Sequence, residues 1–565
     1  MKKRFLLSKT TLWLTLIAGI LAGFTAGFEV TDNIYFKLNK SIDIFGRVYK
    51  EIVANYVDEV DPEKFMHAGI DGMLGMLDPY TVFMDQNEND EIDLITSGQY
   101  GGVGISIGMR DGFVTVISPM EGYSAQKQGV RAGDRIIEID SVKVTGMDLD
   151  SIRAMVRGTP GTEVKMKIQR DGEARPLDFV LMREEIQVND VSYTGLLHDD
   201  IGYIRLDRFS RNAGDEVRRA IADLRAKIKN DSTGGTELRG LILDLRNNPG
   251  GLLESAVDIV SNFLPKGSTV VTTRGRKGED EHVYTVTDDP ALPDIPLVIV
   301  VNRNSASASE IVTGAIQDYD RGVIVGTRTF GKGLVQTITQ LGYNTTLKIT
   351  TARYYTPSGR CIQEIDYAHR NKDGIFLTTP DSLKHKFKTK HGRIVLEAGG
   401  IAPDTVVNDE EPSALYKELL RKAMFFEFAT TYVAKHPADS TDFTVSDSLL
   451  SEFDHYLKKK KFDYKDDAER KLGEVEDLLK KEKYSSRLLA DMDDINRQIE
   501  TEKADAFQRH KEEVREGLEE EIISRYQGER GRIRASLVQD EQVKVAEHVL
   551  ESKRLYSSTL KVVQP

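Results

Sequence analysis

Residues 239–264, RGLILDLRNNPGGLLESAVDIVSNFL, predict a strand, a turn and a helix in succession. Residues 296–319 repeat that order as PLVIVVNRNSASASEIVTGAIQDY. The apolar run RGVIVGT at residues 321–327 then predicts a further strand. Continuous apolar strands that lead directly into helices are typical of a buried sheet with right-handed crossovers. We therefore expect alternating strands and helices over residues 188–404.

Other patterns flank this segment on both sides. Residues 30–95 carry apolar residues at helical spacing, and residues 101–181 alternate apolar and polar residues between glycine turns, which is typical of strands. Residues 410–565 are highly charged, with narrow apolar stripes that predict helices. The expected domains are 1–29, 30–97, 98–185, 186–409 and 410–565.

Composition excludes several classes of protein. A chain of 565 residues is too long for one hydrophobic core, so several domains are expected. The net charge of −13 argues against a nucleic-acid partner, because phosphate contacts need a basic surface. The single cysteine, Cys361, excludes an internal disulfide framework and a cysteine-rich zinc site.

The N-terminus combines basic residues with an apolar segment. MKKRFLLSKT precedes Thr11–Phe28, TLWLTLIAGILAGFTAGF, which contains no charged residue. Its length is at the lower end of a membrane span and exceeds the usual core of a signal peptide. Phe24 and Phe28 interrupt the small-x-small pattern of a cleavage site, which favours a retained signal anchor. The positive-inside rule then predicts a single-pass inner-membrane protein whose body lies in the periplasm.

Ser307 lies in NSASASEIV, at the turn before a predicted helix. With Glu310 it forms the S-x-x-E pattern of a capping box, and such a cap stabilises a helix by about 1 kcal/mol. The same position would expose a serine hydroxyl at the positive end of the helix dipole. The backbone N–H of Ala308 and one from the Gly250–Gly251 turn could then stabilise an oxyanion. The pattern fits both a structural cap and a nucleophile.

A nucleophilic serine needs a base, and lysine is the better-placed residue type. None of the ten histidines lies in the strand–turn–helix motifs, so a Ser-His-Asp triad is a minor alternative. Lys332 lies between Gly331 and Gly333, just after an apolar strand. A lysine acts as a base when it is neutral, and burial favours that form. Gln336 could hold the amine by a hydrogen bond, whereas the ordinary alternative for GKG is a turn lysine.

The motifs GLILDLRNNPGG, NRNSASASEI, GTRTFGKGLVQ and GGIAPD, in this order, closely resemble the carboxyl-terminal processing peptidases, also called tail-specific proteases. The resemblance covers roughly residues 40–405. It implies a crotonase-like α/β protease core that cleaves with a Ser/Lys dyad, without a metal or an organic cofactor. The implied site residues are the nucleophile Ser307, the base Lys332, its support Gln336, and the oxyanion donors Ala308, Gly250 and Gly251.

The segment from 101 to 181 resembles a PDZ domain of the bacterial type. GQYGGVGISI matches the carboxylate-binding loop and its strand, and GVRAGDRIIEID matches a helix–turn–strand. The resemblance implies that the N–H groups of Gly102, Val103 and Gly104 bind a C-terminal carboxylate, while the peptide adds as a strand to the sheet edge. Arg157 matches the position that couples PDZ binding to the active site in relatives.

Together these features predict an exported, membrane-tethered serine endopeptidase that binds C-terminal tails of proteins and cuts upstream of them. The expected fold class is multidomain α/β: a crotonase-like core with an inserted PDZ domain, a helical N-terminal region and a helical C-terminal extension. The terminal helices are candidate surfaces for a homodimer or an adaptor protein. The alternatives are a non-catalytic PDZ scaffold with an inert protease core and a Ser/His hydrolase.

Overall fold

The structure, a computed structural model, describes most of the chain and contains two compact units that divide after Phe83. The described residues are 34–85, 96–110, 112–198, 200–230, 237–276, 280–370, 376–408, 411–436 and 443–561. Each unit is described by itself.

The first unit is a pair of helices. Residues 34–55 are helical, and α2 (Pro62–Leu74) follows after a short loop. Asp61 caps α2 by accepting from the N–H groups of its first turn. Tyr49 stacks on Phe65 with ring centroids 5.6 Å apart and donates its hydroxyl to the carbonyl of Pro62. These contacts fix the packing of the two helices within the unit.

No helix within the described ranges combines the length and the apolar character needed to cross a membrane. The predicted anchor at Thr11–Phe28 lies outside the described residues.

The second unit is built around a six-stranded sheet with the order β10-β11-β12-β15-β16-β23. β10 is antiparallel to β11, and the remaining neighbours are parallel. Every residue of β12 and β15 is buried, as the apolar runs predict. The strands are β10 (Val191–Leu197), β11 (Ile201–Leu206), β12 (Gly240–Asp244), β15 (Leu297–Val301), β16 (Val323–Gly326) and β23 (Thr405–Val406).

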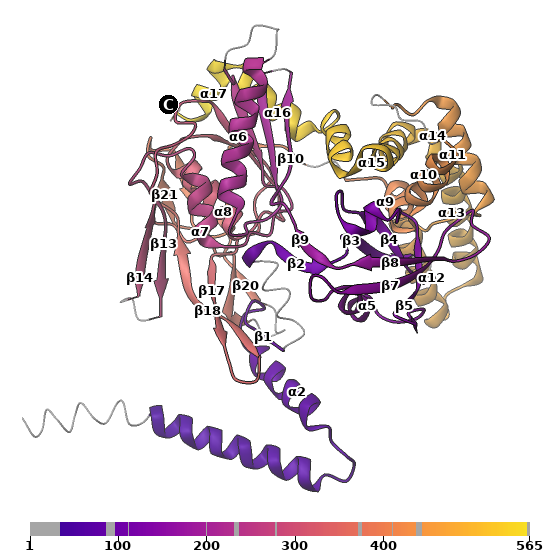
Figure 1. Cartoon of the computed structure of the whole chain (residues 1–565), viewed down its shortest axis with the longest axis horizontal. Helices are drawn as coiled ribbons and strands as arrows, with labels where there is room; N and C mark the ends of the chain where they lie inside the picture. The colour runs from indigo at the N-terminus through magenta and orange to yellow at the C-terminus, as the bar shows by residue number, and fades with distance from the viewer. Residues whose placement is uncertain are drawn as a thin grey trace, which may run out of the picture. The chain divides into compact units, whose positions relative to one another are not determined.

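Helices cover both faces of this sheet (Figure 1). On one face, α6, α7 and α8 bury the larger part of the core. On the other, α16 packs Val543, Val549 and Leu550 against strand residues such as Val298 and Val300. Helix α16, near the end of the chain, therefore covers the second face of this sheet. The helices are α6 (Ala213–Asn230), α7 (Leu253–Val260), α8 (Ala308–Asp318), α16 (Glu541–Glu551) and α17 (Lys553–Thr559).

In a smaller antiparallel sheet, β18 pairs with both β17 and β13, and β13 pairs with β14. The hairpin β17–β18 corresponds to the predicted edge hairpin, and Lys332 lies two residues before it begins. These strands are β13 (Thr269–Gly275), β14 (Glu281–Thr285), β17 (Leu334–Gln340) and β18 (Thr346–Tyr355); the short pieces after them are β19 (Ile365–Arg370), β20 (Phe376–Thr378), η1 (Asp381–Leu383), β21 (Lys386–Lys388) and β22 (Ile394–Leu396).

The predicted PDZ segment forms a separate sheet with the order β3-β4-β5-β7-β8, and β6 pairs with β5. In this order β3 lies at one end, which leaves an edge to which a peptide strand could add. The ribbon β2–β9 connects the segment to the core sheet. The elements are β2 (Gln99–Gly102), β3 (Ile105–Arg110), β4 (Phe113–Pro119), α4 (Ser124–Lys127), β5 (Arg135–Ile139), β6 (Val142–Lys143), α5 (Leu149–Val156), β7 (Glu163–Gln169), β8 (Leu177–Met182) and β9 (Glu184–Gln187).

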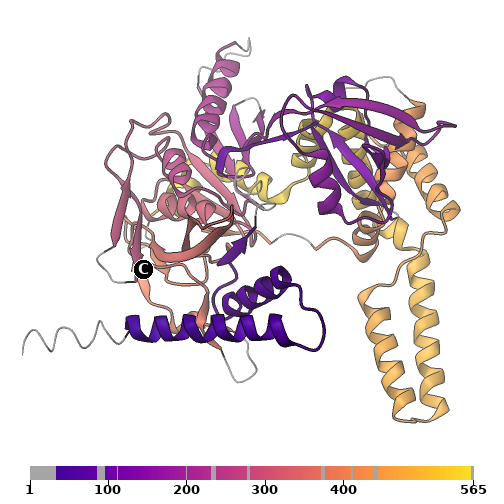
Figure 2. The ribbon, with the colours of Figure 1, turned by 60° about the horizontal axis from the view of Figure 1, so that its bottom comes forward.

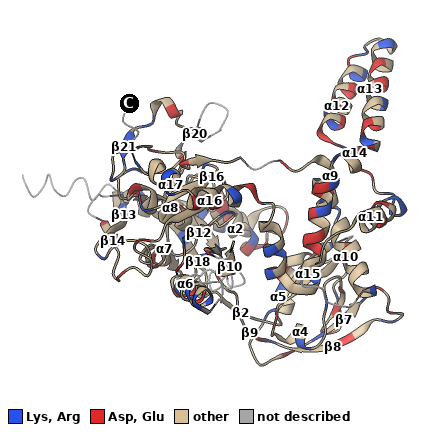
Figure 3. Ribbon diagram, turned by 90° about the horizontal axis from the view of Figure 1, so that it is seen from above, with Lys and Arg blue, Asp and Glu red and all other residues tan. Residues whose placement is uncertain are grey.

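Residues 414–537 form a helical region with its own aromatic core. Phe425 stacks on Phe453 at 5.4 Å, and Phe428 meets Phe453 edge-on. Helices α12 and α13 form a long hairpin (Figure 2), and charged residues of both signs alternate along it (Figure 3). The helices are α9 (Ala414–Arg421), α10 (Met424–Lys435), α11 (Asp447–Lys459), α12 (Asp467–Lys481), α13 (Ser486–Ala504), α14 (Ala506–Arg509) and α15 (Lys511–Leu537).

These layers confirm the predicted fold class, a multidomain α/β protein with an inserted small domain and helical regions near both ends.

Candidate active site

Ser307 occupies a strained turn between β15 and α8. It is the N-cap of α8, with φ 56° and ψ −114°. A non-glycine residue in a sparsely populated conformation costs about 1–3 kcal/mol, and such strain concentrates at functional sites. The carboxylate of Glu310 accepts a hydrogen bond of 2.9 Å from the Ser307 N–H, as expected for a capping box. Ser307 itself is partly exposed.

The Gly250–Gly251 turn lies directly against the Ser307 turn. A Cβ at Gly250 would lie 2.8 Å from the carbonyl oxygen of Ala306, the backbone nitrogen of Ala308 and the Cβ of Ser307. Gly250 also has φ +98°, so the position requires glycine for both its conformation and its contacts. The structure thus brings together two of the segments that the motifs predicted.

Some backbone N–H groups of these two turns already donate hydrogen bonds within the protein. The N–H of Gly250 donates to Oδ1 of Asn248 at 2.9 Å. Gly251 also forms a β-bridge with Phe209. In this bridge the Phe209 N–H donates to the Gly250 carbonyl, and the Leu252 N–H donates to the Phe209 carbonyl. Ala308 is the first helical residue, where an N–H has no acceptor within the helix. Gly251 and Ala308 are therefore the better candidates for oxyanion donors.

The Lys332 loop is joined to α8 through Glu310. Oε2 of Glu310, which accepts from Ser307, also accepts from the Lys332 N–H at 2.9 Å. Oε1 accepts from the Gly331 N–H at 2.7 Å and from the Thr329 hydroxyl at 2.6 Å. One carboxylate therefore connects the turn that bears the serine to the loop that bears the lysine.

Tyr354 joins the same two residues through their carbonyl groups. Its hydroxyl lies 3.3 Å from the carbonyl oxygen of Ser307 and also donates to that of Lys332. The side chain comes from β18 and is only 1% exposed. In the sequence, the S-x-x-E pattern indicates only a capping role for Glu310, and Tyr354 carries no signal because it is a tyrosine in an ordinary strand.

The environment of Glu310 shifts its titration. Complete burial raises the pKa of its carboxyl group from 4.5 to about 7, although hydrogen bonds from Thr329, Gly331, Lys332 and Ser307 favour the charged form. Burial thus opposes the negative charge that these four donors stabilise.

Gln336 lies on β17, where its amide nitrogen donates to the Thr350 hydroxyl at 3.0 Å. Several histidines of the described chain bond elsewhere: His198 to Glu547, His369 to Asp366, His385 to Glu397 and His391 to Asp320. None of these contacts involves Ser307, so this geometry gives the Ser/His alternative no support.

The PDZ loop residues form a tight, glycine-dependent turn. Gly104 has φ +75°, and a Cβ there would lie 2.4 Å from the Cβ of Tyr123. Val103 is buried, and its carbonyl accepts from the Ala125 N–H. Gly102 ends β2. Arg157 follows α5, and its guanidinium stacks on the ring of Tyr100, 4.9 Å from the centroid. This contact links the PDZ segment to the β2–β9 ribbon.

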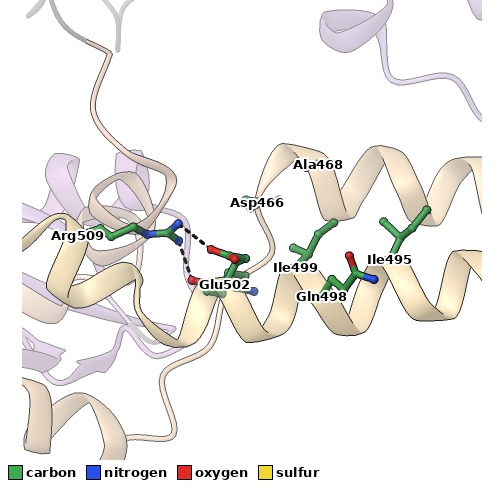
Figure 4. Close-up of a pocket in the computed structure, with 8 residues that line it drawn as sticks. Asp466, Ala468, Ile495, Gln498, Ile499, Glu502 and Arg509 are labelled. Atoms are coloured by element: carbon green, nitrogen blue, oxygen red, sulfur yellow. Dashed lines mark hydrogen bonds and ion pairs between the residues drawn. The ribbon is translucent and has the colours of Figure 1, made fainter.

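A hollow of about 380 Å³ lies in the C-terminal helical region (Figure 4). It is lined by residues between Asp466 and Arg509, and Arg509 bonds to Glu502 there. None of the predicted catalytic residues lines it. Within the described ranges, no group of three or more His, Cys, Asp or Glu side chains could hold a metal ion.

Comparison with known proteins adds to this geometry. The sequence matches Peptidase family S41 over residues 200–369, a PDZ domain over 91–169, the N-terminal domain of the activating protease CtpB over 28–88, and the C-terminal helical domain of a probable PDZ-protease over 415–550. It is 40% identical over 337 residues to a carboxy-terminal-processing protease of Bartonella bacilliformis, covering 60% of this chain and 76% of the relative. The chain belongs to the carboxy-terminal processing protease family.

Other members of the carboxy-terminal processing protease family are also similar. CtpB of Bacillus subtilis is 30% identical over 434 residues, which is 73% of this chain and 87% of CtpB. The solved structure of the photosystem II D1 C-terminal processing protease is 25% identical, with a TM-score of 0.33, and the match covers 64% of this chain and 92% of that one. Membership of this family confirms the resemblance and indicates a serine-type peptidase with a PDZ domain.

Proposed function

We propose that this protein cleaves peptide bonds with a Ser307–Lys332 dyad. The observation that carries the proposal is the connection of the strained Ser307 turn to both the Gly250 turn and the Lys332 loop. Three segments distant in sequence converge there, and each contributes a group that acyl transfer requires: a nucleophile, a base and backbone donors.

The reaction would proceed through an acyl-enzyme. The Ser307 hydroxyl attacks the scissile carbonyl while neutral Lys332 accepts its proton. The N–H groups of Ala308 and Gly251 hold the oxyanion, and removal of one such donor typically costs about 10²–10³ in kcat. The lysine then protonates the leaving amine, and a water molecule activated by the same lysine hydrolyses the ester. Gln336 would support the lysine by accepting a hydrogen bond from its amine.

The substrates of this site would be proteins with exposed C-terminal tails. The N–H groups of Gly102, Val103 and Gly104 would bind the terminal carboxylate, and the tail would add to the edge of β3. Arg157 would couple binding of the tail at the edge of β3 to the active site in the protease core. The terminal helices would provide the surface for a homodimer or an adaptor protein.

The proposed location is the outer side of an inner membrane. The apolar, charge-free segment Thr11–Phe28 after a basic N-terminus supports a single-pass anchor that exports the rest of the chain. Mass spectrometry of the N-terminus of the membrane-bound protein would test it, since a retained anchor predicts a peptide that includes residues 11–28.

Three variants test the chemistry. The chain without residues 1–29 is incubated with an unfolded protein, and the products are mapped by mass spectrometry. Ser307→Ala and Lys332→Ala should each abolish the cleavage products of the wild type, whereas His391→Ala should retain them. Cleavage by Ser307→Ala equal to the wild type would exclude the nucleophile. Activity that survives Lys332→Ala but is lost with one histidine would favour the Ser/His hydrolase, and absence of cleavage by the wild type would favour the scaffold.

A further inference from the structure

One carboxylate and one phenol join the two residues of the proposed dyad. Oε2 of Glu310 accepts from the N–H groups of Ser307 and Lys332, each at 2.9 Å. The hydroxyl of Tyr354 interacts with the carbonyl oxygens of the same two residues. Glu310 thus binds the backbone N–H groups of Ser307 and Lys332, and Tyr354 binds their carbonyl groups.

This arrangement exceeds what a helix cap requires. A cap needs one or two hydrogen bonds at the first turn, and it commonly lies at the surface. Glu310 is instead completely buried, which is costly for a carboxylate unless donors surround it. Three of its four donors, from Thr329, Gly331 and Lys332, belong to the lysine loop and not to α8. Most hydrogen bonds that Glu310 accepts therefore come from the loop that carries Lys332.

We propose that Glu310 and Tyr354 are positioning residues, which fix the Ser307 turn and the Lys332 loop relative to each other. The inference rests on the proposed Ser/Lys function and adds two residues to it. Both side chains are buried, at 0% and 1% exposure, so their proposed role is to hold the backbone and not to contact the substrate. Because a side chain follows its backbone, a shift of either segment would move the hydroxyl of Ser307 relative to the amine of Lys332. A misplacement of about 1 Å in an active site can cost about 10²-fold in rate.

Two conservative variants remove these contacts. Each carboxylate oxygen of Glu310 accepts two hydrogen bonds. In Glu310→Gln an amide nitrogen, itself a donor, takes the place of one oxygen, so in either orientation of the amide it faces two donors. Tyr354→Phe removes the hydroxyl and keeps the ring in the core. Tyr355→Phe is the matched control on the same strand, where the ring of Tyr355 stacks with Arg274. Glu547→Gln is the matched control for loss of a buried carboxylate. Glu547 lies on α16, is 9% exposed and bonds to His198.

The test measures kcat and KM separately for a peptide substrate, with thermal unfolding as a check on folding. We expect Glu310→Gln to lower kcat about 100-fold. Tyr354→Phe should lower it about tenfold, as loss of one hydrogen bond of about 1.4 kcal/mol in the transition state would. KM should stay close to that of the wild type, and both controls should keep the wild-type kcat.

Folded variants with kcat equal to their controls, or with a change in KM alone, would overturn the inference. If Glu310→Gln does not fold, Tyr354→Phe decides the question by the same criterion. Ser307→Ala, assayed beside them, separates the two levels: activity in Ser307→Ala refutes the dyad itself, whereas an inactive Ser307→Ala with a fully active Tyr354→Phe refutes only the positioning role.

Discussion

At the scale of single residues, the site includes a glycine, Gly250, whose position leaves no room for a side chain. Gly250 combines φ +98° with contacts of 2.8 Å from the position of its missing Cβ to the Ser307 turn. A methyl group there must displace the turn that carries the proposed nucleophile.

Gly250→Ala should therefore lower kcat by at least about 100-fold, because oxyanion donors and nucleophile would both move. The matched control is Gly267→Ala, since Gly267 has φ +85° but open space around a Cβ. That control introduces the same backbone strain without the collision and should keep its kcat. Steady-state kinetics on one peptide checks both, and equal kcat values for the two variants would contradict the proposed role of the turn.

Glu310 should also make stability depend on pH. Burial raises the pKa of its carboxyl group from 4.5 to about 7 in the folded chain, so folding favours the protonated form. Its contribution to the free energy of unfolding is then complete below about pH 4.5 and is lost as the pH rises toward about 7. Glu310→Gln cannot titrate, so urea unfolding should show its destabilisation relative to the wild type to be smaller at about pH 8 than at about pH 5. An identical difference at both pH values would refute the raised pKa.

The sequence predicts some residues of the site but not others. Ser307, Lys332 and the glycine turn stand in short motifs with chemical meaning, and the structure brings the two turns together. Glu310 matched a common capping pattern, which gives no sign of its bonds to a loop 19 to 22 residues later. Tyr354 lies in a strand that alternates like any other, and its contact with two distant carbonyls arises only from the folded arrangement.

At the scale of elements, α16 is the least expected part of the core. Its apolar residues cover the sheet face formed by β12, β15 and β16. Arg246, just before the glycine turn, pairs with Asp540, the N-cap of α16, at 2.7 Å. Apolar periodicity can predict such a helix, but it does not specify which surface the helix will cover. That information lies in complementary shapes far apart in the sequence.

Leu550→Ala should cost about 2–5 kcal/mol of stability, because it leaves a cavity in this packing. Leu550 is only 2% exposed and lies against Gly240, where a Cβ would approach it to 2.8 Å. Leu555, on α17, is 36% exposed and provides the control. Leu555→Ala should change the free energy of unfolding by only about 0.5 kcal/mol. Denaturant titration compares the two, and equal losses would show that α16 contributes little to the core.

At the scale of the whole molecule, the PDZ segment and the protease core should act on one substrate. β3 lies at the end of its sheet, and Gly104 requires glycine because of its positive φ and its contact with Tyr123. A C-terminal carboxylate is therefore expected to set the affinity for tails.

A peptide with a C-terminal amide should have a higher KM than the same peptide with a free carboxylate, with similar kcat, because its terminus offers no anion to the loop N–H groups. Gly104→Ala should remove this difference by disrupting the loop. Gly112→Ala is the control, since Gly112 has φ +77° with open space around a Cβ. If the wild type cleaves both peptides with the same KM, the PDZ loop does not read the carboxylate.

The proposed chemistry depends most on Ser307 as nucleophile and Lys332 as base, and covalent labelling tests both directly. A peptidyl phosphonate ester reacts with an activated serine by forming a bond to its oxygen and releasing its leaving group, and mass spectrometry locates the adduct. We predict one adduct, on Ser307, which forms much more slowly in Lys332→Ala and not at all in Ser307→Ala. An adduct on another residue of a protein that still digests its substrate, or wild-type labelling rates in Lys332→Ala, would contradict the Ser307–Lys332 dyad.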